Sequence, residues 1–266
     1  MAKNKVTKNA KPAKKPARPA TKADEAIRLL TARFNQMTGV VEQLAQREFY
    51  ARVGAAGARE KVAAVAAQDR FVKATNDGWL EVLIGGVRQP LPSGLKVSLR
   101  QTSGGRDSGI VSEGAFEGQA FDVTSGFLEA AYRRLDSLVV NVVTRQAGPV
   151  TIGGVTYDLG VTLTYNEGGA AKSSGPFPAK TDPMNPVPAG SHDLEIADFP
   201  HPYGSGYGTY GMIWFRIGHS GDRYLHPGKV SLGCITCEPG NWTTIYQIVH
   251  AARLDSKSVG KLTFAP

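Results

Sequence analysis

The chain has 266 residues, 41% apolar and 20% charged, which suffices for one large or two ordinary globular domains without disulfides to supply a core. Its net charge of +8 comes from 31 Lys and Arg against 23 Asp and Glu, and eight of the cations lie in residues 1–23, which hold no acid. From Asp24 onward the balance is 23 against 23. Nucleic-acid-binding domains usually carry clustered basic charge on the folded domain, so the composition argues against nucleic acid as a partner.

The N-terminal segment, residues 1–23, alternates Ala and Pro with Lys. It lacks the apolar core of a secretory signal, so we expect synthesis in the cytoplasm without a recognisable signal peptide. Because it cannot bury enough apolar surface to offset the entropy of ordering, it is predicted to be a disordered basic tail. No run of 18 apolar residues occurs anywhere in the sequence, which predicts no transmembrane segment.

Residues 24–75 contain no proline and are predicted to form a helical region. Apolar residues recur every three or four positions and would form one seam along a helix: Ile27, Leu30, Phe34, Met37, Val41 and Leu44. A second, Ala-rich helix is predicted from about Ala58 to Ala74. The seam fits either packing on the rest of the chain or docking on a partner protein.

Residues 76–146 change to an alternating pattern that predicts a small β-rich module. Its turn residues resemble those of transthyretin-like sandwiches, with a turn at Pro90–Gly94. One helical interruption is predicted near Phe127–Leu135. The expected strands are Leu80–Ile84, Lys96–Arg100, Gly118–Val123 and Leu138–Val143.

Residues 147–266 are rich in Gly and Pro, and they predict a β-rich domain with long loops and one late helix at Trp242–Ala252. The fold class is therefore mainly β, with an α-helical N-terminal region. The strands expected here are Tyr157–Tyr165, Gly190–Ile196, Met212–Ile217 and Lys261–Phe264.

The chemistry is expected at Cys234, which follows Ser231, Leu232 and Gly233. A thiol nucleophile needs a nearby base and a backbone that lets sulfur approach a carbonyl. His219 lies fifteen positions upstream. Gly233 removes a side chain that would obstruct the substrate, and the amides beside it are candidates for an oxyanion hole.

At these residues the sequence resembles the catalytic domain of the L,D-transpeptidases, whose signature is a His, a loop, and Ser/Thr-His-Gly-Cys. The segment Pro188–Leu194 is similar to a strand that precedes the catalytic segment in that family, and Thr164–Gly169 is similar to its opening hairpin. Together these patches cover roughly residues 150–266.

Two positions depart from the family pattern. Leu232 stands where a second His is usual, and Thr236 where an Arg is usual. The Ser-x-Gly-Cys form resembles a divergent branch found among peptidoglycan-targeting toxins that type VI secretion delivers.

The resemblance implies roles for individual residues. Cys234 is the nucleophile, His219 the general base, and Ser220 supplies the carbonyl that orients the imidazole. Ser231 and Gly233 shape the nucleophile loop, and Arg223 and Tyr224 are candidate substrate-binding residues. No metal or other cofactor is implied.

Other readings stay open. Cys237 is expected to be a buried structural thiol, and the Cys234-x-x-Cys237 pair with His219 and His226 could instead form a zinc or redox site. His226 is expected in a loop, with little effect on activity when replaced by Ala. His192, His201 and His250 are expected at the surface or in packing, and the Gly-Tyr segment around Tyr203, Tyr207 and Tyr210 fits a glycan-stacking lid or ordinary packing.

These observations predict a cysteine acyltransferase or carboxypeptidase of L,D-transpeptidase type that acts on peptidoglycan stem peptides in the periplasm or cell wall after non-classical secretion. The alternative is a non-catalytic cell-wall-binding or structural module of a secretion or phage particle. As partners we expect a secretion-apparatus or chaperone protein, bound through residues 1–75, and, for an antibacterial effector, an immunity protein.

Overall fold

The computed structural model describes residues 67–266, and this part of the protein is mainly β, as the sequence predicts. The predicted basic tail at residues 1–23 and the apolar seam Ile27–Leu44 lie outside the described residues. No helix within residues 67–266 has the length and apolar character needed to cross a membrane.

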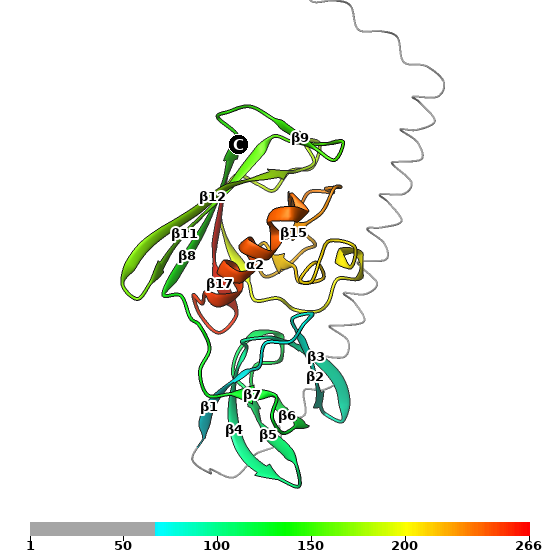
Figure 1. The fold of residues 1–266 in the computed structure, drawn as a ribbon, viewed down its shortest axis with the longest axis vertical. Helices are drawn as coiled ribbons and strands as arrows, with labels where there is room; N and C mark the ends of the chain where they lie inside the picture. Colours follow the sequence, from blue (N-terminus) through cyan, green and yellow to red (C-terminus); the bar gives the residue numbers. More distant parts are fainter. Residues whose placement is uncertain (1–66) are drawn as a thin grey trace, which may run out of the picture. The chain divides into compact units, whose positions relative to one another are not determined.

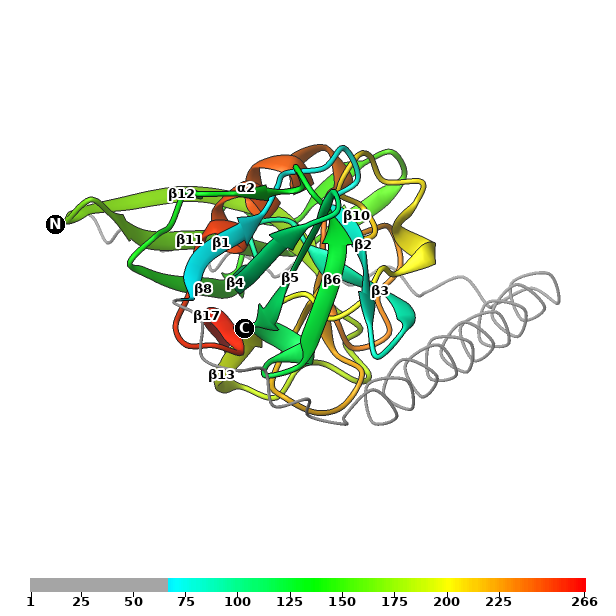
Figure 2. The ribbon, with the colours of Figure 1, turned by 90° about the horizontal axis from the view of Figure 1, so that it is seen from below.

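The first sheet takes the strands up to Glu129, in the order β3-β2-β6-β5-β4-β1-β7 (Figures 1 and 2). In β2, Leu80, Val82 and Ile84 are buried while Glu81 between them is exposed, the alternation of a strand with one face on a core. The strands are β1 (Gln68–Val72), β2 (Trp79–Ile84), β3 (Val87–Pro92), β4 (Lys96–Ser103), β5 (Arg106–Val111), β6 (Ala120–Thr124) and β7 (Leu128–Glu129).

The second sheet has the order β13-β17-β8-β11-β12-β16-β15-β14. Its interior strand β8 pairs in parallel with β17 and antiparallel with β11. The strands are β8 (Ser137–Thr144), β11 (Leu159–Glu167), β12 (Ala170–Lys180), β13 (Gly190–Glu195), β14 (Phe215–Arg216), β15 (Tyr224–Pro227), β16 (Ile235–Cys237) and β17 (Ser258–Ala265), and a separate hairpin joins β9 (Val150–Ile152) to β10 (Val155–Tyr157).

Helix α2 (Trp242–Ala251) lies beside β17 (Figure 1). Its buried residues Trp242, Ile245 and Val249 are spaced by three and four, so one face of the helix enters the core. That core is continuous between the two sheets. Three short 3₁₀ helices complete the described elements: η1 (Gly114–Phe116), η2 (Pro202–Gly204) and η3 (Pro239–Asn241).

Most predicted strands and the late helix are confirmed, but three predictions are wrong. The predicted helix Ala58–Ala74 fails at its C-terminal end, because Gln68–Val72 is a strand that pairs with β4 and β7. The predicted helical interruption Phe127–Leu135 contains no helix, since residues 128–129 pair with β1 instead. The first part of the Pro90–Gly94 turn is strand β3, which tolerates proline because it lies at the sheet edge.

A fourth correction concerns the boundary between the two parts. The strand Leu138–Val143 forms as predicted, but it belongs to the second sheet rather than to the smaller β-rich module. The change of sheet therefore falls between Glu129 and Ser137. The strand's exposed Val139 and Val143 alternate with buried Leu138, Val140 and Val142, which pack into the shared core.

A buried charged cluster joins the two sheets. Glu113, which follows β5, accepts hydrogen bonds from Arg253 at 2.9 Å and from Arg134 at 3.2 Å. Burial alone would raise the pKa of Glu113, but the two guanidinium groups hold it below its ordinary value. Burial lowers the pKa of Arg253 to about 10. Nearby, the Gly114 amide donates to the Ser256 carbonyl at 2.7 Å, so backbone and side chains connect the sheets at one place.

Replacing Glu113 by Gln should destabilise the fold strongly, because two buried guanidinium groups lose their counter-charge. Breaking a buried ion pair from one side costs about 3–5 kcal/mol. We expect a loss of that order in the free energy of unfolding measured with urea. The matched control is Glu81→Gln, which removes an exposed pair with Arg88 and should change stability by less than about 1 kcal/mol. Equal effects of the two variants would contradict this account of Glu113.

Candidate functional site

The predicted nucleophile lies where two short parallel strands meet. β15 pairs with β16 so that Leu225 is opposite Ile235 and His226 opposite Thr236. Side chains alternate along a strand, so Tyr224 and His226 share one face of the sheet with Cys234 and Thr236. The connection between the strands is short, residues 228–234, and it contains the Ser-x-Gly-Cys motif.

Cys234 lies in a small aromatic cluster with Trp214 and Tyr224, separate from the main core. Its Sγ accepts a hydrogen bond from the Tyr224 amide at 3.4 Å and donates one to the Asp222 carbonyl at 3.7 Å. The residue is 6% exposed. The amide favours the thiolate, the reactive form of a cysteine, whereas the Asp222 carbonyl and the burial favour the neutral thiol.

The loop before Cys234 is held by hydrogen bonds. The Ser231 hydroxyl donates to the Cys234 carbonyl at 2.8 Å, consistent with a role for Ser231 in shaping the loop. Gly233 has φ of +110°, and a Cβ there would lie 2.7 Å from the backbone oxygen of Asn185. Only glycine fits this backbone without strain.

Asn185 is a site residue that sequence reasoning missed. Its side-chain amide donates to the Leu232 carbonyl at 3.4 Å, and its Oδ1 accepts from Arg223 at 2.7 Å. Arg223 therefore reaches the nucleophile loop through Asn185. No local pattern marks Asn185, because its contacts depend on a close approach of two loops far apart in sequence.

The contacts of His219 are with residues of β13 and β17. Its ring nitrogens lie 3.4 Å from Asp193 and 3.8 Å from Glu195, and Nε2 is 3.3 Å from the Ser258 hydroxyl. The side chain is 42% exposed. These contacts face β13 and β17 rather than the Ser220 carbonyl, so the roles of His219 and Ser220 stay predictions from the family resemblance.

His226 was expected in a loop, and that expectation is wrong. It is a buried residue of β15, because its strand pairs with β16. Its Nδ1 is 2.8 Å from the Pro227 carbonyl and its Nε2 is 3.1 Å from the Thr236 hydroxyl. A carbonyl oxygen can only accept, so we assign the proton to Nδ1, which leaves Nε2 free to accept.

The ring of His226 ends a stack of four buried aromatic rings. Centroid distances are 4.3 Å from Phe199 to His201, 4.2 Å from His201 to Trp214 and 4.2 Å from Trp214 to His226. Burial lowers the pKa of His226 to about 4, and it lowers that of His201 as well. Both imidazoles are therefore neutral at pH 7.

Arg216 connects this stack to the hairpin turn. Its buried guanidinium donates to Glu195 at 2.8 Å, to Asp198 and to the Gly221 carbonyl, and it lies 5.0 Å above the Tyr224 ring. Burial and the nearby Asp198 raise the pKa of Glu195, whereas His201 and Arg216 hold that of Asp198 below its usual value despite its burial. The network fixes the turn that carries the Asp222 carbonyl and the Tyr224 amide.

The zinc and redox readings of the cysteine pair do not fit this arrangement. Cys237 faces the main core on the opposite side of the sheet from Cys234, and its burial raises the pKa of its thiol. No group of three or more His, Cys, Asp or Glu residues within the described part of the chain is arranged to hold a metal ion.

Protonation of the buried imidazoles should make stability depend on pH. The unfolded chain binds a proton at each histidine below about pH 6.5, whereas folded His226 remains neutral down to about pH 4. Unfolding therefore takes up protons, and stability should fall as the pH drops from 6.5 to 4, by up to about 3 kcal/mol for His226.

Urea denaturation across this pH range measures the effect. In His226→Gln, the slope of the unfolding free energy against pH should correspond to one fewer proton taken up on unfolding. This holds whatever the variant's stability at pH 8. An unchanged slope would mean that the folded protein protonates His226 as readily as the unfolded chain does.

Comparisons with known proteins identify no relative: no family model, curated protein or solved structure matches this chain.

Proposed function

We propose that this protein is a peptidoglycan-modifying cysteine enzyme of L,D-transpeptidase type, with Cys234 as its nucleophile. The observation that carries the proposal is the thiol held at the start of β16, with the Tyr224 amide on its sulfur and a positive-φ glycine before it. This is the arrangement that the Ser231-x-Gly233-Cys234 motif leads one to expect of a nucleophile loop.

The reaction follows from thiol chemistry. The thiolate attacks the carbonyl carbon of the amide that follows the L-centre of a stem peptide, a C–S bond forms, and the C–N bond breaks. The terminal D-amino acid leaves as an amine, taking the proton that the base received from the thiol. Water or another amine then attacks the thioester, the C–S bond breaks, and the thiol regains its proton. Hydrolysis, transpeptidation and D-amino-acid exchange are three outcomes of the same intermediate.

Two imidazoles compete for the role of base, and the strand register favours His226 over His219. His226 and Cys234 are diagonal neighbours on one face of adjacent strands, and Thr236 lies directly across from His226. Its neutral Nε2 can accept a proton. Burial lowers the pKa of the ring to about 4, so the imidazolium depends on the thiolate formed with it and on the Trp214 ring stacked against it. The second-His position of the family remains Leu232 here.

A turnover assay tests the enzyme itself. Tetrapeptide-bearing muropeptides incubated with the protein should release D-Ala, or exchange it for a supplied D-amino acid, and Cys234→Ala should abolish this. Cys237→Ala, which removes a core thiol, is the matched control and should retain turnover if circular dichroism shows it folded. Identical chromatograms for the wild type and Cys234→Ala would refute the enzyme and favour a non-catalytic cell-wall-binding or structural module.

Thiol alkylation ranks the two cysteines and the two histidines. At pH 6, iodoacetamide should modify Cys234 well before Cys237, whose thiol is fully buried with a raised pKa. We expect His226→Gln to slow both alkylation and turnover by about 100-fold or more, and His219→Gln to retain most of each. The reverse order of the two variants would make His219 the base, as the family resemblance implies.

The biological setting belongs to the same proposal. An enzyme that acts on stem peptides meets its substrate in the periplasm or cell wall. The resemblance to type VI secretion toxins supports an antibacterial effector, with a secretion-apparatus or chaperone protein bound by its N-terminal region and an immunity protein in the producing cell. Because β1 begins at Gln68, any truncation that tests the N-terminal region should keep residues from 67 onward.

A further inference from the structure

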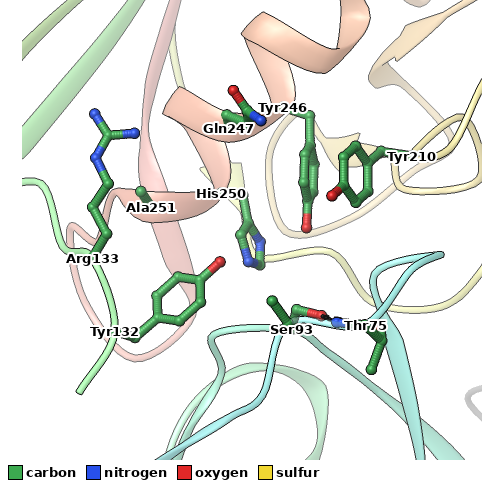
Figure 3. Close-up of a pocket in the computed structure, with 10 residues that line it drawn as sticks. Thr75, Ser93, Tyr132, Arg133, Tyr210, Tyr246, Gln247, His250 and Ala251 are labelled. Atoms are coloured by element: carbon green, nitrogen blue, oxygen red, sulfur yellow. Dashed lines mark hydrogen bonds between the residues drawn. The ribbon is translucent and has the colours of Figure 1, made fainter. Parts of the chain in front are cut away.

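A pocket lies apart from Cys234, where helix α2 faces the loops of the first sheet. Its volume is about 370 Å³. Small-molecule pockets span about 300–1,000 Å³, so this one suits a single ring rather than an oligomer. Figure 3 shows the side chains around it, among them Thr75, Ser93, Tyr132, Tyr210, Tyr246 and His250.

Aromatic rings form one wall of the pocket. Tyr210 stacks on Tyr246 with centroids 4.1 Å apart, Tyr246 stacks on His250 at 4.8 Å, and Tyr132 meets His250 edge-on at 5.6 Å. Tyr210 belongs to the Gly-Tyr segment that the sequence left open between a glycan lid and ordinary packing. Its ring lies in the pocket wall (Figure 3).

His250 carries an unsatisfied polar atom at this site. It is 3% exposed, and its Nε2 has no hydrogen-bond partner within the described residues. Figure 3 shows the ring directed from α2 into the space between Tyr132 and Ser93. Burial, together with Arg253 and Arg134, lowers the pKa of His250 well below its ordinary value, so the ring is neutral. Leaving such a group unpaired costs about 1–3 kcal/mol, which a ligand hydrogen bond would recover.

The rest of the lining is polar but almost uncharged. Hydroxyl groups of Thr75, Ser93 and the three tyrosines surround the space. Among the described lining residues only Arg133 is charged, and its side chain pairs with Glu167 at 2.7 Å. Arg253 and Arg134, whose charges act on His250, are paired with Glu113, so an ionic ligand would find little unpaired counter-charge here. A sugar ring suits this lining, because its hydroxyl groups can bond to the polar side chains and its C–H groups can pack against the aromatic wall.

We propose that this pocket binds one neutral pyranose ring, with His250 Nε2 hydrogen-bonded to the sugar. The proposed function suggests which sugar: the N-acetylhexosamine of the glycan strand that bears the stem peptides. That identity rests on the proposed function, whereas the binding of a neutral pyranose rests on the pocket alone.

Calorimetric titration of the full chain with N-acetylglucosamine tests the proposal. We expect saturable binding that His250→Phe weakens about tenfold, the effect of one lost hydrogen bond. Tyr132→Phe removes a rim hydroxyl from a partly exposed ring and should also weaken binding, which keeps the test decisive if His250→Phe does not fold. The matched control is His192→Phe, which changes a partly exposed histidine of β13 outside the pocket.

Separate outcomes distinguish this proposal from the proposed function. Cys234→Ala should bind the sugar as the wild type does, even though it turns over no muropeptide. No binding, binding unchanged in both His250→Phe and Tyr132→Phe, or tighter binding of glucuronate than of N-acetylglucosamine would each overturn a neutral pyranose site. Sugar binding without muropeptide turnover would refute the enzyme and leave the pocket standing.

Discussion

The Cys234 site depends on one buried charge, the guanidinium of Arg216. Burying a cation is unfavourable unless its partners are close and well aligned. Arg216 is 2% exposed and meets Glu195 on β13, Asp198 just after it, and the Gly221 carbonyl in the hairpin turn. Three segments are therefore held at one point. The turn so fixed carries both backbone groups that contact the sulfur of Cys234.

This arrangement separates two environments on either side of the same hairpin. Carboxylates gather around His219, where Asp193 also pairs with Lys261 at 2.9 Å. Aromatic rings surround His226, which is neutral and buried. Two histidines seven positions apart thus have opposite surroundings. One is a partly exposed imidazole beside anions, and the other is a buried imidazole beside an indole ring and a hydroxyl.

The sequence predicted what depends on local pattern. Short apolar runs mark β2 and β8, and spacing by three and four marks α2, so these elements could be found without the structure. The misses arise from pairing. His226 is followed by Pro227 and Gly228, which usually signal a loop, and it is a strand residue only because β16 lies alongside. Asn185 and the residues of the pyranose pocket come together from distant segments, and no local sequence pattern predicts such contacts.

The site residues divide in the same way. The Ser231-x-Gly233-Cys234 motif is short and contiguous, so its glycine and hydroxyl could be assigned chemistry from their order alone. The orientation of His226 could not, because it depends on which face of the sheet the strand turns toward Cys234. A strand shifted by one residue would turn His226 to the other face.

The charged cluster at Glu113 carries a consequence for how the chain folds. Glu113 meets Arg253 across 140 positions, and β8 obtains one of its two neighbours only from β17 near the C-terminus. During synthesis the first sheet emerges long before Arg253 and β17. Until then Glu113 lacks the ion pair with Arg253. Contacts this distant in sequence slow folding. The C-terminal segment therefore completes the fold. A chain that stalls before Arg253 leaves β8 without β17, and this open edge of the second sheet invites association.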